Sequence, residues 1–327
     1  MPARPASPSR RNLPPSVSIR EVGPRDGLQN EAPVPPAERA RLVRALADAG
    51  CRSIEAVSFV SERAVPAMAG AAEVIALVSR GDAGASGRRS TSGGSELRLT
   101  ALVPNLRGAE RAIEAGVAAL TVTISASAAY NDKNVRMTIE ESLREIESVA
   151  GLAAGQGMAV DAVVSCSFGS PFEGEIDPGE VAGLAARLAE AGCSDLTFAD
   201  TTGVASPRRL DAVLSALEAR TGRAARDVGL HLHDTRGTAL VNAWAAMEAG
   251  VRRFDTSLGG LGGSPFAPGA GGNLATEDLV GLLDDVGVAT GIRLSALLKA
   301  GSLARDLVGH ALAGRTMSAL EGSARAY

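Results

Sequence analysis

Two histidines separated by one residue, His231 and His233, are the side chains in this 327-residue chain best suited to bind a metal ion. They lie in the segment VGLHLHD, whose apolar residues predict a β-strand. Side chains two positions apart in a strand point to the same face, so both imidazole rings would face the same way. We interpret the pair as metal ligands rather than as two packed interior histidines. The remaining histidine, His310, lies in a predicted helical stretch near the C-terminus and is expected to be structural.

A carboxylate and an amide extend this candidate metal site. Asp26 follows the first predicted strand in the turn Gly-Pro-Arg-Asp-Gly, and Asn273 ends the glycine-rich segment 259–273, GGLGGSPFAPGAGGN. Two imidazoles and one carboxylate suit a divalent first-row metal, and a further oxygen donor with open positions also allows Mg²⁺ or Mn²⁺. The glycine-rich segment lacks the GK[ST] of a phosphate loop and suits a mobile lid, with an ordinary surface loop as the alternative.

Three charged residues are expected to support that site. Glu55 lies inside the apolar strand SIEAV, where a carboxylate is costly unless it is paired. We predict that it pairs with Arg25, which precedes Asp26, and thereby fixes the arginine. Asp200 ends the predicted strand LTFAD, and it either supports the metal ligands or caps the helix that follows.

Other chemistries are disfavoured by composition. Of the two lysines, Lys133 is expected in the polar loop after the fourth strand and Lys299 in a C-terminal helix. Neither lies in a predicted strand, so a Schiff-base mechanism is not expected. The three cysteines lie far apart without a CxxC spacing, which argues against a disulfide framework or a thiolate zinc site. The net charge is 33 minus 37, or −4, and no apolar run approaches the roughly 20 residues of a membrane span. We therefore expect no nucleic-acid or membrane partner.

The N-terminal residues 1–16, MPARPASPSRRNLPPS, are basic and rich in proline, alanine and serine. They contain no apolar segment of a secretory signal and are predicted to be a disordered tail. Together with the cysteine usage, this favours a reducing compartment. We expect the cytoplasm, with the mitochondrial matrix as the alternative.

Short β-rich runs alternate along the chain with longer helical stretches rich in alanine and leucine. The predicted strands are Val17–Val22, Ser53–Val57, Leu97–Leu102, Leu120–Ile124, Ala159–Val164, Asp195–Ala199, Val228–His233 and Arg253–Ser257. The predicted helices are Pro36–Ala49, Val65–Ser79, Leu106–Ala115, Ile139–Ala154, Pro178–Ala191, Pro207–Arg220, Ala239–Ala249 and Thr276–Val286. Several helices end in Ala-Gly, where glycine supplies a left-handed cap.

About eight such units are the number that closes a parallel barrel. We predict an α/β fold, a (β/α)8 TIM barrel over residues 17–290, with a flexible insertion at about 80–95 and a helical C-terminal extension over 291–327. Barrel enzymes place their sites at the carboxyl ends of the strands, where the residues singled out above would lie. An open doubly wound sheet is disfavoured because no G-x-G-x-x-G follows the first strand.

Four segments resemble the signature sequences of the 3-hydroxy-3-methylglutaryl-CoA lyase family. They are EVGPRDGLQNE, SIEAVSFVS, HLHDTRGTAL and GLGGSPFAPGAGGNLATEDLV, and the resemblance spans roughly residues 17–310. The related isopropylmalate and homocitrate synthases share the R-D-G turn and the H-x-H strand, but they typically continue RDGEQ, whereas this chain has RDGLQNE. The resemblance therefore favours the lyase branch.

The resemblance implies a divalent-metal TIM barrel that cleaves 3-hydroxy-3-methylglutaryl-CoA to acetyl-CoA and acetoacetate. By motif, the metal ligands would be Asp26, His231, His233 and Asn273. Arg25 would stabilise the enolate, while Glu55 and Asp200 would support the site. A metal-bound histidine is suspected as the base in the family, but a ligating nitrogen cannot also accept a proton. His231 and a water-relayed carboxylate thus stay as alternatives, and self-association into a homo-oligomer is left open.

Departures from the family pattern bear on the substrate more than on the reaction. Ser264 replaces the cysteine of the GGCP loop, and a hydroxyl is a much weaker acid than a thiol, whose pKa is about 8.5. Ala32, Ala128 and Ser170 replace a common lysine, glutamate and cysteine. The alternatives are another 3-hydroxy-acyl-CoA, with a longer chain or of the citramalyl type, and a catalytically silent barrel that only binds acyl-CoA.

Overall fold

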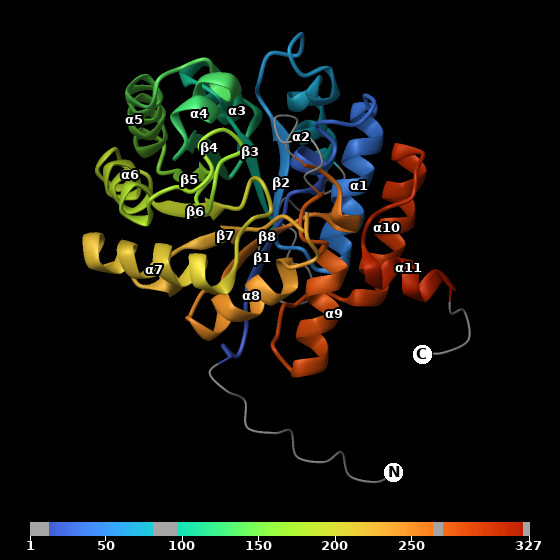
Figure 1. Cartoon of the computed structure of the whole chain (residues 1–327). Coiled ribbons are helices and arrows are strands. Elements are labelled where there is room, and N and C mark those ends of the chain that lie inside the picture. Colours follow the sequence, from blue (N-terminus) through green and yellow to red (C-terminus); the bar gives the residue numbers. More distant parts are fainter. Residues whose placement is uncertain (1–12, 81–96, 264–270, 323–327) are drawn as a thin grey trace.

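The computed structural model describes residues 13–80, 97–263 and 271–322, which contain a closed barrel of eight parallel strands in sequential order (Figure 1). The strands are β1 Ser18–Glu21, β2 Ser53–Ser58, β3 Arg98–Leu102, β4 Ala119–Ser125, β5 Ala159–Ser165, β6 Asp195–Ala199, β7 Gly229–His231 and β8 Arg253–Thr256. β1 closes the barrel by pairing in register with β8 as well as with β2. The predicted TIM barrel is therefore confirmed.

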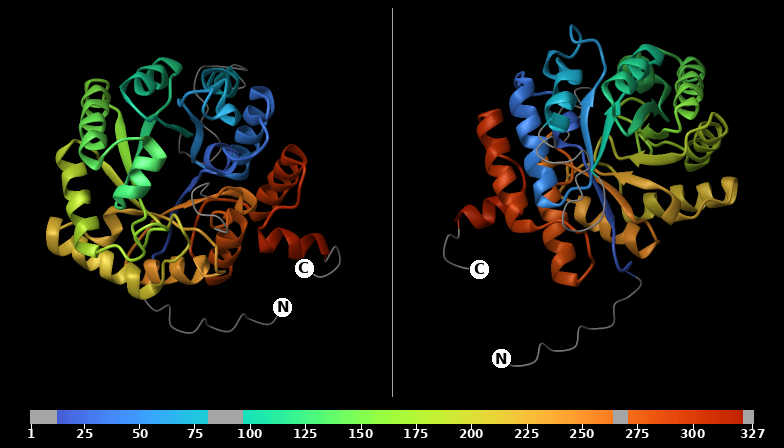
Figure 2. Two further views of the ribbon diagram at one scale, coloured as in Figure 1. Left: turned by 45° about the horizontal axis from the view of Figure 1, so that its top comes forward. Right: turned by 180° about the vertical axis from the view of Figure 1, so that it is seen from behind.

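Helices cover the outside of the barrel, as the two further views show (Figure 2). They are α1 Pro36–Ala49, α2 Ala71–Arg80, α3 Leu106–Ala115, α4 Ala128–Val135, α5 Ile139–Gly155, α6 Pro178–Glu190, α7 Pro207–Thr221, α8 Ala239–Glu248, α9 Thr276–Val286, α10 Leu294–Val308 and α11 Arg315–Gly322. α10 packs beside α1 on the rim of the ring (Figure 1). No helix among the described residues combines the length and hydrophobicity needed to cross a membrane.

Three local predictions were wrong. The helix expected over Val65–Ser79 is a 3₁₀ turn at Pro66–Met68 followed by α2, because the chain turns at Gly70, whose φ is +71°. Lys133 lies in α4 rather than in a loop, since Ser127 caps that short helix by accepting a hydrogen bond from the amide of Tyr130. His310 lies between α10 and α11 instead of inside a helix.

Residues 1–12, 81–96, 264–270 and 323–327 lie outside the described part of the chain. The expected tail, insertion and lid fall largely on these segments, and so does Ser264. The roles given to them above stay predictions.

One ionisable side chain is buried where the end of β1 meets the segments that surround the barrel. Glu21 is fully buried at the end of β1 and accepts hydrogen bonds from Gly23 N at 2.8 Å, Leu258 N at 2.9 Å and Thr276 Oγ1 at 2.5 Å. It thereby joins the segment after β1 to the segment after β8 and to the first residue of α9. Burial raises the pKa of Glu21 to about 7, and the three hydrogen bonds only partly oppose that shift.

Substituting Glu21→Gln should remove a pH-dependent loss of stability. The wild-type glutamate is protonated in the folded protein between about pH 4.5 and pH 7 but ionised in the unfolded chain. The free energy of unfolding therefore falls as pH rises through that window, by on the order of 2–3 kcal/mol from this residue. Urea titrations of the metal-free protein at pH 5 and pH 7.5 should show a smaller decrease for Glu21→Gln, whereas Glu147→Gln on the exposed face of α5 should match the wild type. Equal decreases in all three proteins would contradict the assignment.

Candidate metal centre

The turn that follows β1 directs Asp26 into the barrel mouth. Residues Gly23–Gly27 form one π-helical turn whose members are all buried. A Cβ on Gly23 would lie 2.6 Å from Glu21 Oε1, and one on Gly27 would lie 2.9 Å from Ser257 Oγ. Only glycine lets this turn pack so closely against the end of β1 and the segment after β8.

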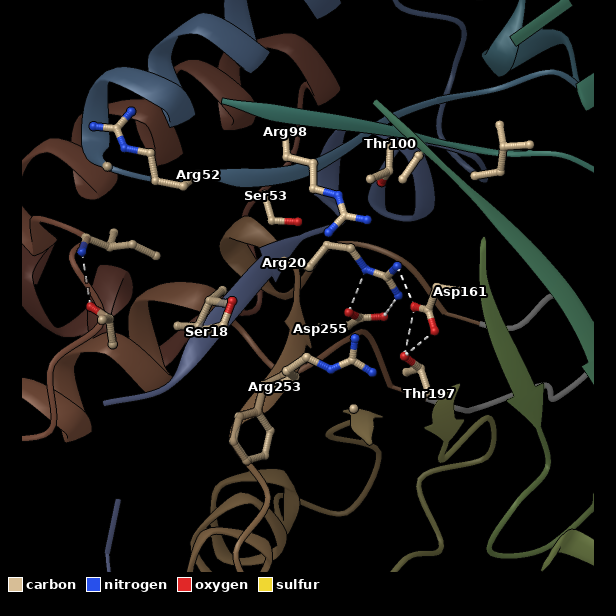
Figure 3. Close-up of a pocket in the computed structure, with 18 residues that line it drawn as sticks. Ser18, Arg20, Arg52, Ser53, Arg98, Thr100, Asp161, Thr197, Arg253 and Asp255 are labelled. Atoms are coloured by element: carbon tan, nitrogen blue, oxygen red, sulfur yellow. Dashed lines mark hydrogen bonds and ion pairs between the residues drawn. The ribbon is translucent and has the colours of Figure 1, made fainter. Parts of the chain in front are cut away.

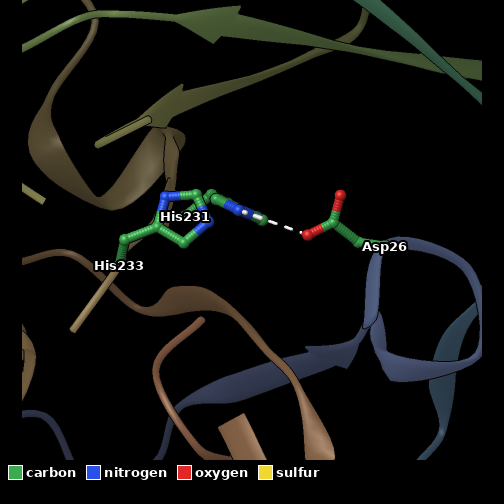
Figure 4. Close-up of side chains that lie close together, drawn as sticks. All are labelled: Asp26, His231 and His233. Carbon is green, nitrogen blue, oxygen red and sulfur yellow. Dashed lines mark ion pairs between the residues drawn. The ribbon is translucent and has the colours of Figure 1, made fainter. Parts of the chain in front are cut away.

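The two histidines of the H-x-H motif face Asp26, as predicted (Figure 4). His231 is the last residue of β7 and His233 follows that strand. Their ring centroids are 5.1 Å apart at an interplanar angle of 84°, and one potential ligand atom from each ring and from Asp26 lie within 4.8 Å of one another. His231 Nε2 is 3.9 Å from Asp26 Oδ2. The carboxyl ends of β1 and β7 thus bring together three of the four predicted ligands.

Asn273 joins them because the chain before α9 pairs with the end of β7. Asn273 forms an antiparallel bridge with His233, and its Nδ2 donates hydrogen bonds to Asp26 Oδ2 at 2.7 Å and to the carbonyl oxygen of Leu261 at 2.9 Å. A Cβ on the preceding Gly272 would overlap the carbonyl oxygen of Gly260. Glycine at this position therefore permits the close chain approach that places Asn273 in the site.

The four side chains present a donor set that fits a divalent cation. Within the described residues, His233 Nε2 and Asn273 Oδ1 are buried and have no hydrogen-bond partner. Burial lowers the pKa of His233 to about 4, so its ring is neutral, as a metal ligand must be. Burial alone would raise the pKa of Asp26, but Arg25 and His231 outweigh it and lower that pKa, which keeps the carboxylate ionised. The four side chains therefore offer nitrogen and oxygen donors of the kinds that divalent cations bind.

The expected ion pair between Arg25 and Glu55 is present. Arg25 donates through Nε to Glu55 Oε1 and forms an ion pair with the same oxygen through Nη2, and its Nη1 lies 2.7 Å from Asp26 Oδ1. Glu55 is fully buried on β2, so it needs this partner. A guanidinium has five N–H groups, and these contacts leave donors available for an oxygen of a bound substrate.

Asp200 supports the site mainly through its main chain. Its carbonyl oxygen lies 2.8 Å from His233 Nδ1, which places the ring proton on Nδ1 and directs Nε2 to the metal centre. Its carboxylate accepts hydrogen bonds from Val204 N at 2.8 Å and Ala205 N at 3.0 Å. The alternative that Asp200 caps the next helix is wrong, because Ser206 is the N-cap of α7.

Sequence analysis missed three residues near the ligands. Gln29 donates to Asp26 Oδ1 at 2.9 Å and holds the carboxylate from the side opposite Asn273. Asp255 Oδ2 lies 3.3 Å from His231 Nδ1, and Arg20 in turn binds Asp255. Both Arg20 and Asp255 are charged residues inside predicted strands, as Glu55 is, but the strands around them contain further polar residues. His310, expected to be structural, is exposed and lies 3.0 Å from Glu31 Oε2.

Known proteins of one family are similar to this chain over most of its length. The family model described as HMGL-like matches residues 16–304. A Pseudomonas aeruginosa protein named 3-hydroxy-3-isohexenylglutaryl-CoA/hydroxy-methylglutaryl-CoA lyase is 39% identical over 310 residues, which are 94% of this chain and 98% of that protein. An (R)-citramalyl-CoA lyase of Chloroflexus aurantiacus is 42% identical over 311 residues, or 94% and 95% of the two chains. A solved HMG-CoA lyase of Acinetobacter baumannii, in complex with coenzyme A and 3-methylmalate, has a TM-score of 0.84 at 37% identity and covers 93% of this chain and 95% of its own.

Removing one ligand should abolish tight binding of a divalent cation. We expect Asp26→Ala and His233→Ala to raise the dissociation constant for Mn²⁺ by at least about 100-fold, because even residues that only support ligands contribute about 10- to 100-fold. Electron paramagnetic resonance of free Mn²⁺ measures this constant directly. His310→Ala provides the matched control and should bind Mn²⁺ like the wild type. Wild-type affinity in Asp26→Ala would contradict the assigned metal centre.

Proposed function

The chain belongs to the HMGL-like family, and we propose that it is a divalent-metal-dependent carbon–carbon lyase that cleaves 3-hydroxy-3-methylglutaryl-CoA to acetyl-CoA and acetoacetate. The observation that carries this proposal is the buried group of Asp26, His231 and His233 beside Arg25. A protein that only bound acyl-CoA would have no need for such a set of metal donors. The catalytically silent barrel is therefore the weaker alternative.

An acyl-CoA thioester as substrate is supported by the names of the relatives. Two of them are lyases of CoA esters, and a third was solved with coenzyme A bound. The acyl groups in those names differ, from methylglutaryl and isohexenylglutaryl to citramalyl. The citramalyl relative supports the second candidate, the same bond cleavage on a different 3-hydroxy-acyl-CoA.

We propose Mg²⁺ or Mn²⁺ as the cation, held by Asp26, His231, His233 and Asn273. Such a cation would polarise the hydroxyl group of the substrate and lower its pKa. Loss of the hydroxyl proton and cleavage of the C2–C3 bond would turn the hydroxyl carbon into a ketone and leave an enolate with negative charge on the thioester oxygen. Uptake of a proton at C2 would then complete acetyl-CoA. Arg25 suits the thioester oxygen because Glu55 and Asp26 fix its guanidinium while leaving N–H donors to spare.

The base that accepts the hydroxyl proton is proposed to be a carboxylate acting through water rather than His231. The Nδ1 atom of His231 already faces Asp255, and its Nε2 is the atom directed at Asp26 and the cation. Asp200 is a candidate because its Oδ2 is buried without a partner in the described structure. Burial raises the pKa of Asp200 to about 6, which suits proton exchange near neutral pH.

Incubating the purified protein with Mg²⁺ or Mn²⁺ and a panel of thioesters tests the proposed substrate. The panel contains 3-hydroxy-3-methylglutaryl-CoA, a longer 3-hydroxy-3-alkylglutaryl-CoA and citramalyl-CoA, and release of acetyl-CoA is followed by mass spectrometry. We expect the highest kcat/KM with the methylglutaryl ester. Turnover of citramalyl-CoA alone would select the second candidate, and no cleavage of any ester in the presence of bound metal would select the silent barrel.

Substituting Arg25→Met should lower kcat much more than it changes KM. The guanidinium is expected to act on charge that develops during bond cleavage, and removing one such donor typically reduces kcat by about 10²- to 10³-fold. Arg98→Met, at the exposed start of β3 on the opposite end of the barrel, serves as the control and should retain wild-type kcat. Mn²⁺ affinity is measured in parallel, because Arg25 also contacts Asp26. A rise in KM with unchanged kcat would show that Arg25 only binds substrate.

A further inference from the structure

A chain of charged side chains runs inside the barrel from the amino end up to His231. Arg20 on β1 donates through Nε to Asp255 Oδ1 at 2.8 Å and through Nη2 to Asp255 Oδ2 at 2.6 Å. This is a two-pronged ion pair between side chains that are 13% and 7% exposed. Such paired contacts fix the plane of both groups. Figure 3 shows the pair at the wall of a cavity of about 300 Å³.

The Nη1 atom of the Arg20 guanidinium also has partners inside the barrel. It lies 2.7 Å from Asp161 Oδ2 on β5 and 3.4 Å from Thr121 Oγ1 on β4. Thr197 Oγ1 on β6 lies 2.9 Å and 3.1 Å from the two oxygens of Asp161 (Figure 3). Asp161 and Thr121 therefore contact the Nη1 end of the guanidinium, whereas Asp255 binds its Nε and Nη2.

The register of the sheet places Asp255 directly beside His231. Asp255 on β8 is the register partner of both Arg20 on β1 and His231 on β7. Its Oδ2 lies 3.3 Å from His231 Nδ1. Both oxygens of Asp255 are bound by the Arg20 guanidinium, as is typical of an ionised carboxylate. Because such a carboxylate can only accept, the proton of this contact lies on Nδ1.

We propose that Asp255 and Arg20 are positioning residues of the metal centre: Asp255 fixes the ring orientation and the tautomer of His231, and Arg20 fixes Asp255. The proposal rests on the metal centre proposed above. With its proton held on Nδ1, His231 presents the lone pair of Nε2 to the side where Asp26 lies 3.9 Å away.

The two histidines are positioned in different ways, which makes the proposal testable by substitution. His233 Nδ1 is held by the main-chain carbonyl of Asp200, which a change of side chain leaves in place. His231 Nδ1 depends on the carboxylate of Asp255, which a single substitution removes. A carboxylate that accepts the hydrogen bond from a metal-bound imidazole also makes the ring a stronger ligand than a main-chain carbonyl in the same position would.

The test compares Asp255→Asn with Asp161→Asn. Both variants remove a buried carboxylate that binds the same Arg20 guanidinium, but only Asp255 contacts His231. We expect Asp255→Asn to raise the dissociation constant for Mn²⁺ by about 10- to 100-fold, and Asp161→Asn by less than about threefold. Equal weakening in both variants, or wild-type affinity in Asp255→Asn, would overturn the proposal. Thermal melts of both metal-free proteins check that each variant is folded.

A second readout needs neither metal nor activity. Nitrogen-15 NMR of protein labelled at histidine, recorded without metal at alkaline pH, reports which ring nitrogen carries the proton. The His231 signals should show a proton on Nδ1 in the wild type and in Asp161→Asn, and a mixture of tautomers in Asp255→Asn and Arg20→Met. An unchanged tautomer in both of the last two variants would reject the positioning role. Wild-type protein that binds Mn²⁺ and has the expected tautomer but cleaves no thioester would refute the proposed function alone.

Discussion

The ionised state of Asp26 inside a buried site is the constraint on which this structure depends. A carboxylate can hold a cation only when it is deprotonated, and burial opposes that state. Arg25 supplies the compensating charge at 2.7 Å, while Asn273 and Gln29 donate hydrogen bonds to the two carboxylate oxygens. Glu55 inside β2 contributes to the same effect, because it pairs with Arg25 and holds it beside Asp26.

The ion pairs inside the barrel contain more carboxylates than guanidiniums. Two guanidiniums, Arg20 and Arg25, face four carboxylates, which belong to Asp26, Glu55, Asp161 and Asp255. Uncompensated charge is expensive away from water, so a cation bound beside Asp26 would offset part of this excess of negative charge. Burial raises the pKa of two further carboxyl groups, Glu21 and Glu277, to about 7.

Features that depend on local sequence were predictable, and features that depend on the closure of the barrel were not. Three local features were sufficient to predict the barrel and the two histidines that face Asp26. They are the alternation of strands and helices, the Ala-Gly helix ends and the H-x-H spacing. The link between Arg20 and His231 requires the register of β1 on β8 and of β8 on β7. No spacing in the sequence reveals that register. The main-chain role of Asp200 is hidden in the same way, because a carbonyl group carries no residue-type signal.

Two departures from the family pattern lie after strands that contribute none of the proposed metal ligands. The proposed metal ligands and Arg25 lie at the ends of β1 and β7 and in the segment before α9. The departures from the family pattern at Ala128 and Ser170 lie instead after β4 and β5, where Glu173 joins the two loops by accepting from Ala129 N and from the hydroxyls of Ser127 and Ser170. These loops follow the carboxyl ends of their strands, so they share the face of the barrel with the metal centre while contributing none of its four ligands. The names of the relatives share the lyase activity and differ in the acyl group.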